Sequence, residues 1–179
     1  ETLAVELRDH EAHETRFTAV DLPSLKLRFE PRLCPEEAWW VGLEACAQGV
    51  LLVHGYVDPG TPLRSGLWAL STGTGELLWA AQTAQFCGQL PQGMLIREPA
   101  DEQLQLVAPL SGETRPLQQT EHERQPQLTE AETSAEGQLR FPALLNEGSE
   151  AFNVLAEQIH AREGSQPVRQ MDHLRHGNT

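Results

Sequence analysis

The sequence has almost no lysine and no long apolar segment. Lys26 is the only lysine among 179 residues, and the 13 basic residues face 26 acidic ones. The resulting formal charge of -13 repels phosphate backbones and anionic lipid surfaces, so we expect no nucleic-acid partner and no membrane-surface partner. No apolar run approaches the length of about 18 residues that a membrane-spanning helix needs, and we therefore expect no membrane span.

Cysteine is also scarce, and its pattern points to a reducing environment. Cys34, Cys46 and Cys87 are widely spaced and form no C-x-x-C pair. An odd count argues against a disulfide framework, so we expect free thiols and a cytoplasmic location. An acidic, lysine-poor composition fits either a salt-adapted bacterial protein or an ordinary acidic cytosolic one. Because the sequence opens at Glu1 rather than methionine, we expect a processed or excised part of a longer protein.

An internal repeat is the most informative feature that is present. Residues 17–29 (FTAVDLPSLKLRF) align without a gap with residues 67–79 (LWALSTGTGELLW), and residues 104–116 (LQLVAPLSGETRP) form a third, weaker copy. Each copy has an apolar stretch, a short polar turn and a resumed alternation, which predicts two strands joined by a tight turn. A further apolar run precedes each copy, at residues 3–7, 50–53 and 94–96. Each unit is therefore predicted to be a meander of three or more strands.

The turn residues of the copies support this prediction. Asp21, Ser71 and Ser111 are placed to hold their turns through side-chain bonds to nearby backbone amides. The glycines of the turns, such as Gly75 and Gly112, provide the backbone freedom for a positive φ.

The middle copy resembles the blade signature of quinoprotein-type β-propellers. In that signature the two outer strands of a blade flank a turn ending in glycine, as at Gly75, and the second strand closes on tryptophan, as at Trp79. The resemblance implies repeated β-hairpin units over residues 1–117. No residues match those that hold a quinone or calcium in such enzymes, so no cofactor is carried over. Because a propeller needs about four to eight blades, three units predict either part of a larger propeller or an open, twisted sheet.

The last third of the chain has a different pattern. Residues 118–137 are rich in Gln, Glu and Thr, which predicts a polar loop. Residues 138–179 predict a strand, a helix and a final strand, the last over Val168–Leu174. The helix begins after a Ser149 cap, ends at Gly164 and carries one apolar face, formed by Phe152, Leu155, Ala156 and Ile159. This tail is similar to that of an uncharacterised bacterial family without an assigned activity.

Together these features predict a single domain over residues 1–179. Its fold class is mainly β, an antiparallel meander of propeller-like hairpins with one C-terminal amphipathic helix packed against it. The helix must bury its apolar face, and the sheet is the surface available for that.

The histidine pattern predicts no metal site. His10 and His13 have an H-x-x-H spacing, but they fall between two strand-like runs, where a surface loop is expected. His173 and His176 repeat the spacing and are expected to be exposed in a polar tail. His54 lies within an apolar run, where a lone histidine is typical of a strand edge or the core.

No catalytic group is predicted either. The sequence has no G-x-S-x-G elbow, and the Gly73–Gly75 segment lacks the Gly-Lys-Ser/Thr end of a phosphate loop. Trp39 and Trp40 are adjacent, so in an extended chain one ring is expected in the core and the other on a binding surface.

These observations predict a non-catalytic scaffold or protein-interaction domain without a cofactor, whose partner is a protein. The alternative is an enzyme or small-ligand-binding domain with a site built from loop residues. The candidate ligand-binding residues are Trp39, Trp40, His54, Tyr56, Asp58 and Arg64. An interaction domain predicts an exposed aromatic or apolar patch, whereas a ligand site predicts that these residues converge in a pocket.

Overall fold

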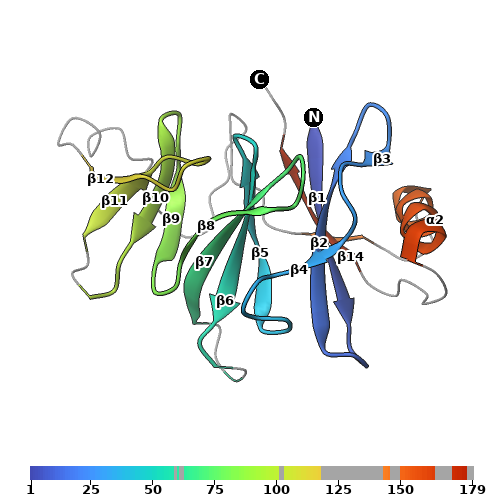
Figure 1. The fold of residues 1–179 in the computed structure, drawn as a ribbon, viewed down its shortest axis with the longest axis horizontal. Helices are drawn as coiled ribbons and strands as arrows, with labels where there is room; N and C mark the ends of the chain where they lie inside the picture. The colour runs from blue at the N-terminus through green and yellow to red at the C-terminus, as the bar shows by residue number, and fades with distance from the viewer. Residues whose placement is uncertain are drawn as a thin grey trace.

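The computed structural model describes residues 1–58, 60, 63–100, 103–117, 143–145, 150–163 and 171–176. These residues form three antiparallel sheets and the helix α2 (Figure 1). The predicted fold class, mainly β with a helix near the C-terminus, is confirmed.

Sheet A joins the two ends of the described chain. Its strand order is β13-β14-β1-β2-β3, with β4 also paired to β2. The strands are β1 (Thr2–Asp9), β2 (Glu14–Asp21), β3 (Lys26–Leu27), β4 (Arg32–Leu33), β13 (Ala143–Leu145) and β14 (Met171–His176). β14 pairs with β1, which places His173 opposite Val5 and His176 opposite Thr2. These histidines therefore lie in a strand, as the predicted final strand required for His173, and not in a tail, whereas the exposure expected of their side chains stays a prediction.

Sheets B and C are simple meanders. Sheet B contains β5 (Val41–Ala47), β6 (Val50–Tyr56), β7 (Arg64–Ser71) and β8 (Leu77–Ala81) in that order. Sheet C contains β9 (Gln85–Leu90), β10 (Gly93–Arg97), β11 (Leu104–Val107) and β12 (Thr114–Pro116).

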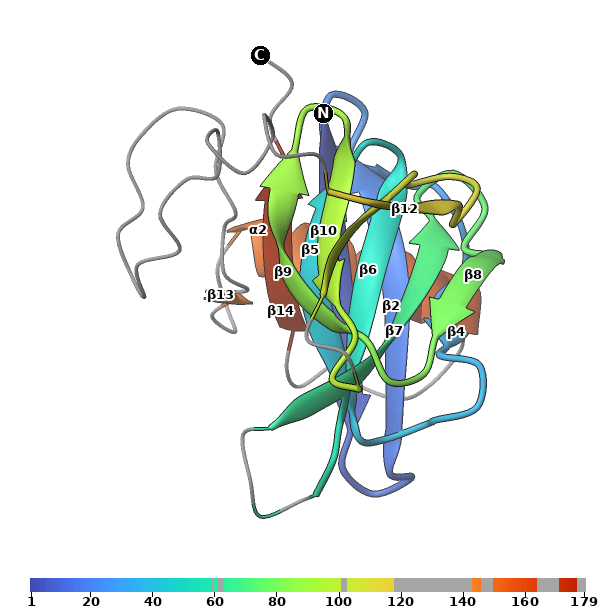
Figure 2. The same cartoon turned by 90° about the vertical axis from the view of Figure 1, so that its left-hand side faces the viewer.

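The three sheets form a stack with sheet B in the middle (Figure 1). β5 packs against β1 and β14 of sheet A, and β7 packs against β9 of sheet C. In Figure 2, where the left-hand side of Figure 1 faces the viewer, sheet C lies in front of sheet B. Residues 50–55 of β6 are all buried because both faces of sheet B are covered. Of the two predicted alternatives, the single open sheet is thus wrong, since the hairpins are distributed over three sheets.

All three repeat copies form the predicted hairpins. Residues 17–29 supply β3 and most of β2, residues 67–79 supply most of β7 and β8, and residues 104–116 supply β11 and β12. Asp21, Ser71 and Ser111 each accept a hydrogen bond from a backbone N–H two or three residues further on, at 3.2, 3.2 and 3.3 Å. The side-chain support predicted for the turns is confirmed.

The turns share a second feature, which connects one sheet to the next. The equivalent positions Leu25, Gly75 and Gly112 have positive φ angles of 53°, 69° and 72°. Phe29, which closes the first hairpin, packs on Gly75, where an added Cβ would lie 2.5 Å from the ring carbon Cε2. Trp79, which closes the second hairpin, packs on Gly112 in the same way, with an added Cβ 2.6 Å from Cγ. Each closing aromatic ring therefore occupies the space above the turn glycine of the next sheet.

This contact is restricted to the two sheet-to-sheet junctions. The Trp79 indole N–H strengthens the second one by donating a hydrogen bond of 2.6 Å to the carbonyl of Pro109. In the third copy the closing position is Pro116, and in the first copy the turn position is Leu25, which has a bulky side chain. Neither end of the stack can therefore make the same contact with a further sheet.

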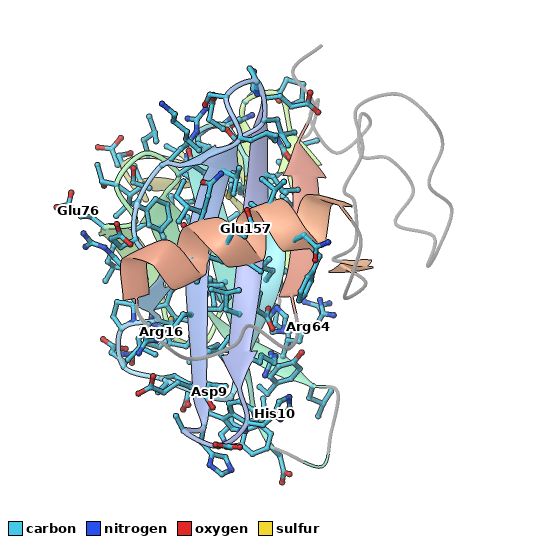
Figure 3. The ribbon with its side chains drawn as sticks, turned by 90° about the vertical axis from the view of Figure 1, so that its right-hand side faces the viewer. Asp9, His10, Arg16, Arg64, Glu76 and Glu157 are labelled. Atoms are coloured by element: carbon cyan, nitrogen blue, oxygen red, sulfur yellow. The ribbon has the colours of Figure 1, made fainter. Side chains whose placement is uncertain are left out.

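Helix α2 (Glu150–Glu163) covers the outer face of sheet A (Figure 3). Its buried side chains are Phe152, Leu155 and Ile159, with Ala156 partly buried beside them, as predicted. They pack on apolar side chains of sheet A, namely Leu3, Val5, Leu7, Val20 and Leu27. Burial of each large side chain contributes roughly 1.5–3 kcal/mol. The predicted caps Ser149 and Gly164, the polar loop over 118–137 and residues 168–170 of the predicted final strand lie outside the described residues.

A buried ion pair joins sheet A to the free edge of β5. The Nε atom of Arg8 lies 2.5 Å from Oε1 of Glu6, whose side chain is 4% exposed. The other carboxylate oxygen of Glu6 accepts a hydrogen bond of 2.8 Å from the Leu43 N–H. Arg8 in turn donates a hydrogen bond of 2.5 Å to the carbonyl of Val41. The pair thereby satisfies backbone groups that an edge strand would otherwise leave unpaired.

We predict that Gly75→Ala destabilises the protein by about 2–5 kcal/mol, because the new Cβ adds overpacking to a strained positive φ. Gly73→Ala is the matched control: it lies in the same turn, and an added Cβ there is 3.6 Å from its nearest neighbour, Oγ of Ser71. Urea denaturation measures the unfolding free energy of both variants. Equal losses in the two variants would contradict the packing argument.

We also predict unequal effects for two ion pairs with the same i, i+2 spacing. Glu6→Ala removes one partner of a buried pair and costs about 3–5 kcal/mol of unfolding free energy. Glu14→Ala breaks the pair with Arg16, whose side chains are 31% and 39% exposed, and costs about 0–1 kcal/mol. Denaturant unfolding of both variants checks this, and a small effect at Glu6 would contradict it.

Candidate functional site

The six predicted site residues lie toward one end of sheet B but divide into two groups. His54 and Tyr56 are in β6, and Arg64 begins β7 across the hairpin. Trp39 and Trp40 precede β5, and the Trp40 carbonyl accepts a hydrogen bond of 2.9 Å from the Tyr56 N–H. The figure with side chains shows Arg64 toward the same end of the molecule as the β1–β2 turn (Figure 3).

The first group forms around a residue that the sequence analysis did not select, Glu44. Nη1 of Arg64 donates to both carboxylate oxygens of Glu44, at 3.1 and 3.0 Å. Nδ1 of His54 lies 2.9 Å from Oε2 of the same carboxylate, a distance that makes an ion pair when the imidazole is protonated. His54 is 3% exposed, and neither ring nitrogen makes a directed hydrogen bond within the described part of the chain.

Local backbone features bring these side chains together. The register of β5 against β6 shifts between Leu43 and Ala45, so Glu44 occupies a β-bulge. Gly42 lies opposite His54, and a Cβ at this glycine would be 3.0 Å from Cε1 of His54 and 3.3 Å from the Tyr56 hydroxyl. The His54 and Tyr56 rings meet edge to face, 4.8 Å apart. Glycine therefore leaves the space that the imidazole and the phenol fill.

The second group surrounds the Trp39 ring. His10 and His13 contact it edge-on with centroid distances of 5.1 and 5.2 Å, and the Arg8 guanidinium carbon lies 5.5 Å from the ring centroid. Both histidines are exposed in the β1–β2 turn, as predicted. Trp39 is only partly buried and Trp40 is 40% exposed, so the prediction that one ring lies in the core is wrong. The reason is local, since residues 38–40 form a bend rather than an extended strand.

Three exposed apolar residues flank the adjoining ends of these strands. Trp40, Val57 and Leu63 are 40%, 61% and 60% exposed, and we refer to them as the Trp40 patch. The Val57 N–H donates a hydrogen bond of 3.0 Å to the Leu63 carbonyl, which places the two residues side by side at the base of the β6–β7 hairpin. Asp58 follows Val57, and its carboxylate accepts a hydrogen bond of 2.7 Å from the Gly60 N–H.

The polar residues that the sequence analysis missed share one signal. Glu6 and Glu44 are each a single acid inside an otherwise apolar strand, in the sequences LAVEL and VGLEACA. A buried charge is costly unless it is paired, so such an acid predicts a partner from elsewhere in the fold. That partner, Arg8 or Arg64, is identifiable only from the structure.

Two further properties bear on chemistry. Within the described ranges, no three His, Cys, Asp or Glu side chains are arranged to hold a metal ion. No helix in these ranges is both long and apolar enough to cross a membrane.

The three cysteines are free thiols, as predicted. Burial is the main cause that raises the pKa of Cys34 and of Cys46 to about 12, and it also raises the pKa of Cys87. A raised pKa disfavours the thiolate, which is the nucleophilic form.

These thiols predict a loss of stability at alkaline pH. In the unfolded chain each thiol has its ordinary pKa of 9.0, whereas in the folded chain the pKa of Cys34 and Cys46 is about 12. Between these values the unfolded state loses protons that the folded state keeps, so the unfolding free energy falls as the pH rises. Denaturant unfolding from pH 8 to about 11 should show a steeper fall for the natural chain than for the Cys34→Ala/Cys46→Ala variant. Parallel curves would contradict this.

In the comparison with known proteins, a family model matches the first part of the chain. No curated protein and no solved structure matches this chain. Residues 1–79, which extend from β1 to Trp79 in β8, match the family model described as a domain of unknown function (DUF4905). This segment therefore resembles an uncharacterised family.

Proposed function

We propose that this chain is a non-catalytic protein-interaction domain and that the Trp40 patch is its contact surface. The observation that carries the proposal is the exposure of Trp40, Val57 and Leu63 together at one end of the stack. Single exposed apolar residues are common on protein surfaces, but three at adjoining strand ends are typical of an interaction site. Tryptophan in particular is enriched among the residues that contribute most to binding.

The fold presents this patch on an anchored support. Glu44 joins Arg64 at the start of β7 to strand β5, and the Tyr56 N–H joins β6 to the Trp40 carbonyl. A surface held in this way loses little conformational entropy when a partner binds. The Glu44 cluster thus holds the strand ends that carry the patch. This is a structural role for His54 and Arg64, which the sequence predicted as ligand-binding residues.

The thiols also favour a non-catalytic role. The raised pKa of Cys34, Cys46 and Cys87 leaves each of them protonated at neutral pH, so none has the activated state of a nucleophile.

A second candidate function rests on one specific observation. His54 is buried beside Glu44, yet its Nε2 has no hydrogen-bond partner among the described residues. A small ligand that supplies such a partner would make this cluster a binding site, in line with the alternative drawn from the sequence. Buried polar atoms of native proteins usually have a partner, and this exception is the reason to test it.

We also propose that the three sheets are diverged blades of the quinoprotein type. The support is the repeated contact of a closing aromatic ring with the turn glycine of the next sheet, at Phe29 with Gly75 and at Trp79 with Gly112. Bacterial origin, a cytoplasmic location and adaptation to salt stay predictions from composition.

Selection of binders from a random peptide display library tests the proposed function. We expect selected peptides to bind the natural chain and to lose at least about tenfold in affinity on the Trp40→Ala/Val57→Ser/Leu63→Ser variant, because hot-spot contacts of this size exceed about 1.4 kcal/mol. The control variant is Leu77→Ser/Leu110→Ser, which removes exposed apolar side chains, 42% and 62% exposed, from other parts of the surface.

The outcomes separate the two functions. Peptides that bind the control variant normally but not the patch variant support an interaction surface at Trp40. Peptides that are insensitive to the patch variant overturn it. Binders that depend instead on His54, measured with His54→Gln, favour the ligand-binding alternative.

A further inference from the structure

We infer that the partner of the Trp40 patch is a positively charged segment that carries an aromatic or aliphatic side chain, an inference that rests on the proposed function. The charges that border the patch determine which partner it fits. They come from the β1–β2 turn, the segment before Trp40 and the loop after Val57.

Four carboxylates in these segments form no direct ion pair with a cation among the residues that the structure describes; we call them the acidic rim. Its members are Asp9, Glu36, Glu37 and Asp58. Glu36 and Glu37 lie four and three residues before Trp40, respectively, and Asp58 directly follows Val57. Asp9 begins the turn whose histidines contact Trp39. The rim carboxylates therefore lie on three segments that adjoin the patch.

Hydrogen bonds hold the rim carboxylates in place without neutralising them. Oε1 of Glu37 accepts from the N–H groups of Trp39 and Trp40, at 2.8 and 3.0 Å. Oε2 of Glu36 accepts a hydrogen bond of 3.1 Å from the Gln82 amide. Each donor is a neutral N–H group, so these hydrogen bonds place no positive charge beside the carboxylates.

The other members of the rim are held in the same way. Oδ1 of Asp9 accepts from the N–H groups of Glu11 and Ala12, both at 2.9 Å, and Oδ1 of Asp58 accepts from Gly60. The backbone hydrogen bond from Ala12 is the main cause that lowers the pKa of Asp9 below its ordinary value. Asp9 therefore stays charged throughout the neutral pH range.

The arginines near the patch form ion pairs with carboxylates that are not part of the rim. Arg8 pairs with Glu6, Arg16 pairs with Glu14, and Arg64 pairs with Glu44. Each of these arginines forms its ion pair with a carboxylate outside the rim, and Arg16 also lowers the pKa of Asp9 through an electrostatic interaction. The border of the patch is thus negative, and the chain as a whole has a formal charge of -13.

This charge distribution selects the chemistry of the partner. A basic segment gains from the rim through faster association and through complementary contacts at the border of the interface. An acidic segment, a phosphorylated peptide or an anionic membrane is repelled by the same charges. The exposed apolar side chains of the patch require an apolar group on the partner for most of the binding energy.

The peptides selected on the natural chain provide the test. We expect them to carry a net positive charge and at least one aromatic or aliphatic residue, and to bind more weakly as ionic strength rises to about 1 M, where the Debye length is about 3 Å. Asp9→Asn/Asp58→Asn removes two rim charges but keeps the acceptor oxygens, and we expect it to weaken binding about three- to tenfold.

A matched control removes two charges from the opposite end. Glu76→Gln/Glu113→Gln changes the β7–β8 turn of sheet B and the β11–β12 turn of sheet C. Figure 3 shows Glu76 far from Asp9 and His10. This variant should bind the peptides as the natural chain does.

The results distinguish the inference from the function on which it rests. Neutral or acidic peptides that still require Trp40 overturn the basic partner but leave the interaction surface in place. Equal weakening by the rim and control variants also overturns it, since the effect then comes from net charge alone. Peptides that ignore the patch variant overturn the proposed function itself.

Discussion

The contact between a closing aromatic ring and the turn glycine of the following sheet is the constraint on which this architecture depends. Apolar sheet faces attract one another without a preferred register, because hydrophobic burial is non-directional. Phe29 over Gly75 and Trp79 over Gly112 provide that register, since each ring fits only where the backbone has no Cβ and turns through a positive φ. Two short sequence features thereby fix how three separate meanders stack.

The same contact explains where the stack ends. Leu25 replaces the glycine in the first hairpin, and Pro116 replaces the aromatic residue in the third. Helix α2 covers the outer face of sheet A with Phe152, Leu155 and Ile159. Strands β5, β6 and β7 of sheet B are largely buried in the middle of the stack, and the proposed interaction surface lies at their ends.

Buried charge connects this packing with function. Glu6 and Glu44 both lie in apolar strands, and each is stabilised by an arginine that reaches it, Arg8 from the same strand and Arg64 from the adjacent hairpin. Glu6 accepts a hydrogen bond from the Leu43 N–H at the edge of β5. Glu44 pairs with Arg64 and so holds the hairpin that carries Val57 and Leu63. The ionic groups of this end therefore stabilise its shape, and the rim carboxylates around Trp40 supply its net charge.

The sequence by itself determined the local structure of this protein. The alternation of apolar residues predicted the three hairpins, and the i, i+3, i+4, i+7 spacing from Phe152 predicted the helix, because both patterns arise from interactions between near neighbours. It also identified His54, Tyr56 and Arg64 as residues of one region. Only the tertiary structure decided that the hairpins belong to three sheets, that β14 returns to β1, that Glu44 joins His54 to Arg64 and that Trp39 and Trp40 lie outside the core. Those outcomes depend on contacts between residues distant in the chain, and no local pattern encodes which distant edge, face or charge will meet.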